Sequence, residues 1–168
     1  MNLDVLLNFY RNDPRCLQIA KGISLPHPQQ IHLSGLSGSS PQFVLASILH
    51  NSPQHNHLVL LRDAEEAAYF HNTLQNITGA LDIFYFPSSF KNKKNFTLLN
   101  SSHVMLRTEA LTRLASSLPD GSRTIAKKVL VTYADEKKEK VVLSKKLAEN
   151  TISIKQADVL DVNAMLEK

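Results

Sequence analysis

The residues that come nearest to a chemical motif form a turn at positions 35–42. Backbone amides of a glycine-rich turn, with the N-terminus of the helix that follows, suit the binding of a phosphate group. Against the phosphate-loop pattern, Pro41 stands in place of the lysine and Gln42 in place of the magnesium-binding hydroxyl. We therefore expect a degenerate phosphate loop that does not bind nucleotide. Its members are Gly35, Gly38, Ser39, Ser40, Pro41 and Gln42.

The same turn comes close to a nucleophile elbow, in which a serine is exposed between a strand and a helix. Ser37 would be the nucleophile, but Ser39 occupies the position of the second glycine. Such a hydrolase also needs a longer chain, with an acid and a histidine after the serine. A tight turn that enters a helix is the better interpretation, and we predict no catalytic residue.

An acidic pair follows the apolar run at 129–133. Asp135 and Glu136 imitate the residues that hold magnesium in ATPases, yet no lysine loop accompanies them. Lys137 and Lys138 come next, so the start of a solvated helix, where the helix dipole favours acids, explains the pair better.

Metal ligands and thiols are scarce. His50, His55 and His57 lie close in sequence, but a third dedicated ligand is missing and the segment between them is typical of a loop. Cys16 is the single cysteine, which excludes an internal disulfide and a thiolate zinc site. We expect no metal site and no cofactor in this chain.

One basic segment has the composition of a phosphate-tracking contact. Lys91, Lys93 and Lys94 lie between Phe90 and Phe96 and could make a weak nucleic-acid contact. An ordinary solvated loop remains the favoured interpretation of three lysines.

Short apolar runs separated by helical patterns must position these residues. Strands are predicted at 31–33, 58–61, 83–86 and 129–133. Strands that alternate with helices require parallel pairing through right-handed crossovers. The expected fold class is therefore α/β, a doubly wound parallel sheet with flanking helices.

Three helices are predicted between these strands. The first begins at Pro41 with Ser40 as its cap. The second has Asp63 as cap and Glu66 three residues later, a capping-box pair. Its apolar stripe is Ala67, Phe70, Leu74 and Ile77. The third runs through 104–115 and should turn inward Leu106, Ala110, Leu111 and Leu114.

Composition limits the class of protein. The 168 residues are 43% hydrophobic and 20% charged, enough for a packed core, and the net charge of +4 permits a nucleic-acid contact without requiring one. No apolar run approaches the length of a membrane span and no signal peptide is visible, so we expect a cytoplasmic protein.

The charge distribution suggests two parts, 1–134 and 135–168. After residue 134 lysine and glutamate become frequent, a strand is predicted at 151–154, and a helix capped by Asp158 or Asp161 continues to the last residue. Since that helix has no stop signal, we expect an α+β subdomain cut short, and a chain that is the N-terminal part of something longer.

The order of these segments resembles a known family. Residues 33–38, 57–67, 83–87 and 129–140 follow one another as in the N-terminal UvrB-like module of the bacterial transcription-repair coupling factors (Mfd). The similarity covers about residues 20–168 and rests on order and spacing. It implies a helicase-like, UvrB domain 1a-like fold whose phosphate loop is working in UvrB and degenerate in the coupling factors, in agreement with Pro41 and Gln42.

The resemblance also implies a function. The full-length proteins of this family are ATP-dependent DNA translocases that remove stalled RNA polymerase and recruit UvrA for nucleotide excision repair, with ATP and magnesium held in motor domains beyond Lys168. The second subdomain, from near Asp135, would contact UvrA largely through residues beyond this chain. We expect a non-catalytic scaffold that serves recruitment and packs against other domains of the parent protein in an autoinhibitory way. The alternatives are an active nucleotide-dependent enzyme and a small nucleic-acid-binding domain.

Overall fold

The fold is built around a small parallel sheet. The structure is a computed structural model that describes residues 2–79, 82–90, 98–115 and 128–134, and the single residues 139 and 141. The chain divides into two units, Met1–Lys138 and Glu139–Lys168, and every element described belongs to the first. The elements in chain order are α1 (Leu3–Asn12), α2 (Pro14–Ile23), α3 (Ser40–Asn51), β1 (His57–Leu61), α4 (Ala64–Thr78), β2 (Asp82–Tyr85), α5 (Ser101–Ala115) and β3 (Lys128–Tyr133).

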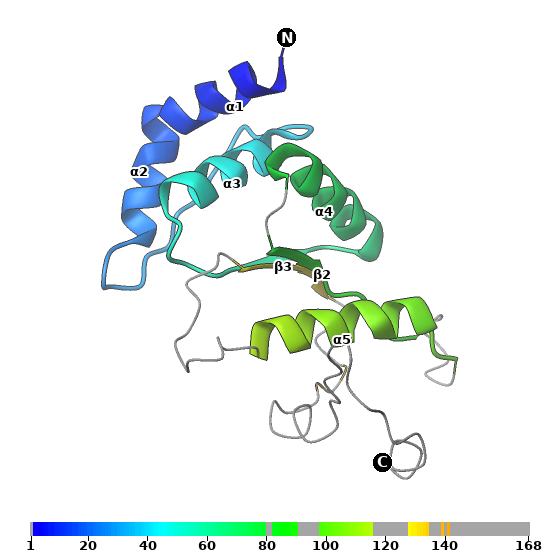
Figure 1. Ribbon diagram of the computed structural model, residues 1–168. Coiled ribbons are helices and arrows are strands. Elements are labelled where there is room, and N and C mark those ends of the chain that lie inside the picture. The colour runs from blue at the N-terminus through cyan, green and yellow to red at the C-terminus, as the bar shows by residue number, and fades with distance from the viewer. Residues whose placement is uncertain are drawn as a thin grey trace, which may run out of the picture. The chain divides into compact units, whose positions relative to one another are not determined.

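The three strands lie in the order β1-β3-β2 and are parallel. Leu130 of the central strand pairs with Leu58 on one side and Phe84 on the other. The chain moves past β3 from β1 to β2 and then returns, so right-handed crossovers place α4 and α5 on opposite faces. Figure 1 shows this arrangement, with α3 and α4 above the sheet and α5 below it. The predicted α/β class with a parallel sheet is confirmed.

Helix α4 begins as its sequence predicts. The Asp63 carboxylate accepts a hydrogen bond from the Glu66 amide at 2.9 Å, and the Glu66 carboxylate accepts one from the Arg62 amide at 3.2 Å. The predicted stripe of α4 is buried, and Leu74 is fully enclosed. Burying a leucine contributes about 1.5–3 kcal/mol, so this face fixes α4 on the sheet.

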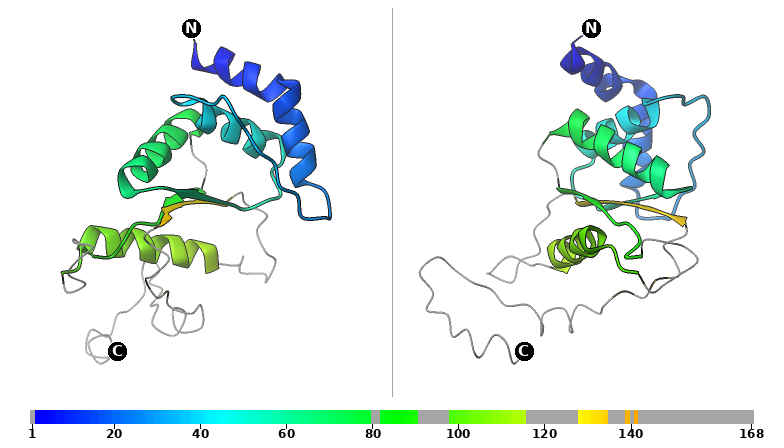
Figure 2. Two further views of the ribbon diagram at one scale, coloured as in Figure 1. Left: turned by 180° about the vertical axis from the view of Figure 1, so that it is seen from behind. Right: turned by 90° about the vertical axis from the view of Figure 1, so that its right-hand side faces the viewer.

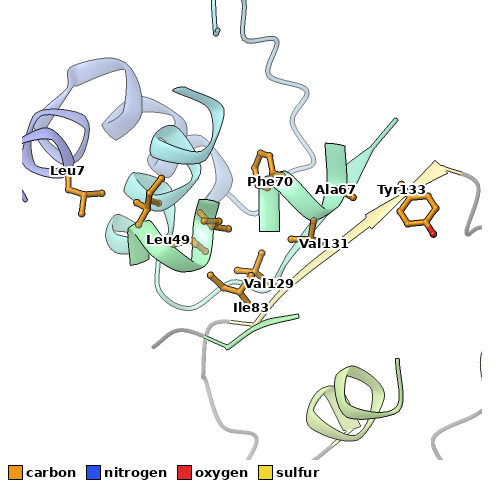
Figure 3. Packing of buried hydrophobic residues seen from close by; sticks show 11 residues of the cluster. Leu7, Leu49, Ala67, Phe70, Ile83, Val129, Val131 and Tyr133 are labelled. Carbon is orange, nitrogen blue, oxygen red and sulfur yellow. The ribbon is translucent and has the colours of Figure 1, made fainter. Parts of the chain in front are cut away.

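The main core lies between the sheet and the α3–α4 layer. Val129 and Val131 of β3, with no exposed surface, and Ile83 of β2 face Leu49 and Phe70 of the helices (Figure 3). These side chains alternate along β3 with Leu130 and Thr132, as the period of two in a strand requires.

Two N-terminal helices extend this layer. Asn2 caps α1 and Asp13 caps α2, and both helices pack against α3 (Figure 2). A second core cluster joins Cys16 of α2 to Val44 and Ile48 of α3. Neither helix was predicted, although Asp13 followed by Pro14 is a helix-start signal.

The opposite face of the sheet is covered only in part. Phe84, Phe86 and Ala110 form a small core between β2 and α5, with Leu111 and Leu130 against it. The prediction that α5 turns four residues inward is partly wrong, because Leu106 and Leu114 remain 37% and 38% exposed. Among the residues that the structure describes, α5 alone packs on this face, and Leu58 and Leu60 of β1 remain 68% and 46% exposed.

The strand predicted at 31–33 is not formed. Residues 31–34 have no regular secondary structure, and Ile31 lies against α2 instead of a neighbouring strand. The apolar run at 31–33 is too short to distinguish a strand from an extended segment that packs on a helix. The predictions for 151–154 and the final helix fall outside the described residues.

Candidate functional site

The turn before α3 is held by its own side chains and carbonyls. Gly35 and Gly38 have φ values of +77° and +57°, which favour glycine. The Ser40 hydroxyl donates to the Ser37 carbonyl at 2.7 Å and accepts from the Ser37 amide at 2.8 Å. Ser40 therefore closes the turn and does not cap the helix, which corrects the prediction made for it. The cap is Ser39, whose side chain makes no capping bond.

The amides of the first turn of α3 are already used. The Ser40 amide donates to the Ser37 carbonyl at 3.1 Å. The amides of Gln42 and Phe43 both donate to the Ser39 carbonyl, at 3.1 and 3.3 Å. The backbone nitrogen of Pro41 carries no hydrogen and cannot donate. Residues 40–43 therefore present no N–H to an incoming phosphate, which is the group that a phosphate loop depends on.

The side chains of Gln42 and Ser39 are directed to the interior and to α4 respectively. The Gln42 side chain is only 3% exposed, and within the described part of the chain its Oε1 has no hydrogen-bond partner. The Ser39 hydroxyl lies 3.2 Å from the Tyr69 hydroxyl of α4, so it is tied to the next helix. Neither side chain carries a positive charge that could neutralise a phosphate group.

A cavity of about 830 Å³ adjoins this turn. It lies between α2, the first part of α3 and the extended segment 25–37, which we call the strap. The wall residues from the helices include Cys16, Ile19 and Val44, and the strap contributes Leu25, Ile31, Leu33 and Leu36. Sequence reasoning missed this cavity, because it depends on α2 and on the path of the strap.

The charged groups of the cavity are few. Arg15 forms an ion pair with Asp13 at 2.7 Å, and this contact, mainly its side-chain hydrogen bond, lowers the pKa of Asp13 to about 2. Lys21 and His32 also line the cavity. Burial raises the pKa of the Cys16 thiol, so the thiol stays protonated near neutral pH and is a poor nucleophile.

Of the other predicted sites, only the histidine cluster lies within the described residues. His55 Nδ1 lies 3.2 Å from the Ser52 hydroxyl, and no group of three metal-ligating side chains occurs among the residues that the structure describes. Lys91, Lys93 and Lys94 lie outside those residues, as do Asp135 and Glu136. The predictions for these five residues stay predictions.

The comparisons with known proteins add no relative. No protein-family model, no curated protein and no solved structure matches this chain. None of the described helices is long and apolar enough to cross a membrane.

Proposed function

We propose that this chain is a non-catalytic α/β module of the transcription-repair coupling factor type, in which a helicase-derived phosphate site has lost its ligand and serves as a docking scaffold. The observation that carries the proposal is the state of the first turn of α3. The N–H groups of Ser40, Gln42 and Phe43 are bonded within the turn, and Pro41 has no N–H to donate. Pro41 also occupies the position of the phosphate-binding lysine.

The fold supports this proposal at a coarse level. A parallel sheet with helices on both faces is the architecture of nucleotide-binding α/β domains, and a glycine-containing turn enters a helix packed on that sheet. The segment before the turn is not a strand, so the turn is not held at a sheet edge as a working phosphate loop is. An inherited but disused site accounts for both features.

The partners follow from the resemblance and belong to the same proposal. UvrA would be bound through the second subdomain, largely beyond Lys168, while RNA polymerase and DNA would be reached through the parent protein. ATP and magnesium would be needed by the motor domains of that parent in the cytoplasm, not by this module.

The test is phosphate release from ATP and magnesium by the whole chain, with and without DNA. We expect release at the level of the buffer blank in both cases, because Pro41 replaces the lysine and the first-turn amides of α3 are bonded within the turn. Turnover above the blank that is lost in Gly35→Ala/Gly38→Ala would show an active site at the turn and refute the proposal. Both glycines have positive φ and a Cβ at either would meet no atom within 4 Å, so that variant strains the backbone of the turn without creating a clash.

A further inference from the structure

The strap exposes an unusual amount of apolar surface beside a cavity. Leu25, Ile31, Leu33 and Leu36 are between 39% and 51% exposed, and all four line the same space. Isolated exposed apolar residues are ordinary, but several that line one cavity indicate a site where an apolar molecule can bind.

The wall facing the strap is packed and apolar. Cys16 and Val44 belong to the buried cluster between α2 and α3 and are 4% and 7% exposed. The strap lies close over this wall at one point, because a Cβ built on Gly22 would be 3.2 Å from Ile31 Cδ1. Buried side chains of α2 and α3 thus form the floor of the cavity, and the strap comes close to α2 at Gly22.

The charge at the cavity favours an acid. Asp13 and Arg15 neutralise one another through their ion pair, so Lys21 is the remaining charged side chain of the lining, with the His32 imidazole beside the same space. A polyanion such as a triphosphate needs several donors, which the first turn of α3 does not supply. A ligand with a single acidic group needs only one cation at the edge of an apolar space.

We propose that this cavity binds a small amphipathic acid, an apolar ring or branched chain that carries one carboxylate or sulfonate. Its body would lie between the strap leucines and the floor formed by Cys16 and Val44, with the acidic group at Lys21. The volume of the cavity lies within the range of about 300–1,000 Å³ that is usual for small-molecule sites. The proposal goes beyond the docking function and does not depend on it.

The test titrates the whole chain with anilinonaphthalene sulfonate and with phenylnaphthylamine, the same ring system without the acid. We expect saturable one-to-one binding of both. Lys21→Gln should weaken the sulfonate by about threefold and leave the neutral probe unchanged. Leu33→Gln/Leu36→Gln should weaken both probes by about tenfold.

A matched control uses two exposed leucines of the sheet. Leu58→Gln/Leu60→Gln removes as many leucines elsewhere on the surface and should leave both affinities unchanged.

Binding that does not saturate, or that responds to the β1 pair and not to the strap pair, would overturn the proposal. Displacement of the probe by ATP would also overturn the single-acid ligand class, and it would contradict the docking function as well. If neither probe binds and the chain also does not bind ATP, the cavity proposal is refuted and the docking function is left standing.

Discussion

The guanidinium carbon of Arg107 lies 4.0 Å from the centroid of the Phe86 ring. The same side chain donates a hydrogen bond from Nη1 to the Pro87 carbonyl at 2.9 Å and is only 6% exposed. One residue of α5 thus holds the chain where it leaves β2. His103 of α5 and Tyr133 of β3 hold the next residue, through the Ser88 carbonyl and amide respectively.

Replacing Arg107 should therefore destabilise the fold. Arg107→Ala leaves the buried Pro87 carbonyl without this donor and removes the contact with the Phe86 ring, so we expect the free energy of unfolding to fall by about 3 kcal/mol. Urea denaturation measures the change. Met105→Ala, on the same helix and 72% exposed, should change the free energy by less than about 0.5 kcal/mol. Equal effects of the two substitutions would contradict this account of Arg107.

Asp13 should make stability depend on pH. Hydrogen bonds from the Arg15 side chain and amide lower the pKa of Asp13 from 3.8 to about 2. The folded state therefore favours the carboxylate, and its contribution is complete above pH 3.8 and is lost as the pH falls through about 2. Asp13→Asn keeps a capping oxygen without the charge.

The measurement for Asp13 is urea unfolding of both proteins at about pH 6 and about pH 2. We expect the wild type to be the more stable at the higher pH and the two to converge at the lower. A difference that is the same at both pH values would show that the ion pair with Arg15 contributes nothing.

Local signals predicted much of the fold. Asp63 with Glu66, and the stripe that includes Phe70 and Leu74, identified α4, because capping and period depend on neighbouring residues alone. The apolar runs of β1, β2 and β3 were also sufficient. The run at 31–33 failed, since a strand needs a partner and the sequence does not show where the chain will lie.

The candidate site divides in the same way. The absence of a lysine and the presence of Pro41 could be read directly from the sequence. The bonds that use up the amides of Ser40, Gln42 and Phe43 could not, because they depend on how the turn closes. The cavity depends on contacts between α2 and the strap, which no local pattern contains.

The open face of β1 gives a contrast between adjacent residues. Leu58 is 68% exposed, whereas Val59 packs against the main core. Leu58→Gln should change the free energy of unfolding by less than about 0.5 kcal/mol, and Val59→Ala should lower it by about 1 kcal/mol. Thermal denaturation of the two variants decides the matter. A loss for Leu58→Gln as large as that for Val59→Ala would mean that this face is covered in the folded protein.

Calorimetric titration of the whole chain with ATP and magnesium tests the central claim most directly. Because Pro41 replaces the cation and the first-turn amides are bonded within the turn, we predict no saturable heat and no affinity tighter than about 1 mM. Micromolar binding that disappears in Gly35→Ala/Gly38→Ala would contradict the claim that this turn has lost its nucleotide.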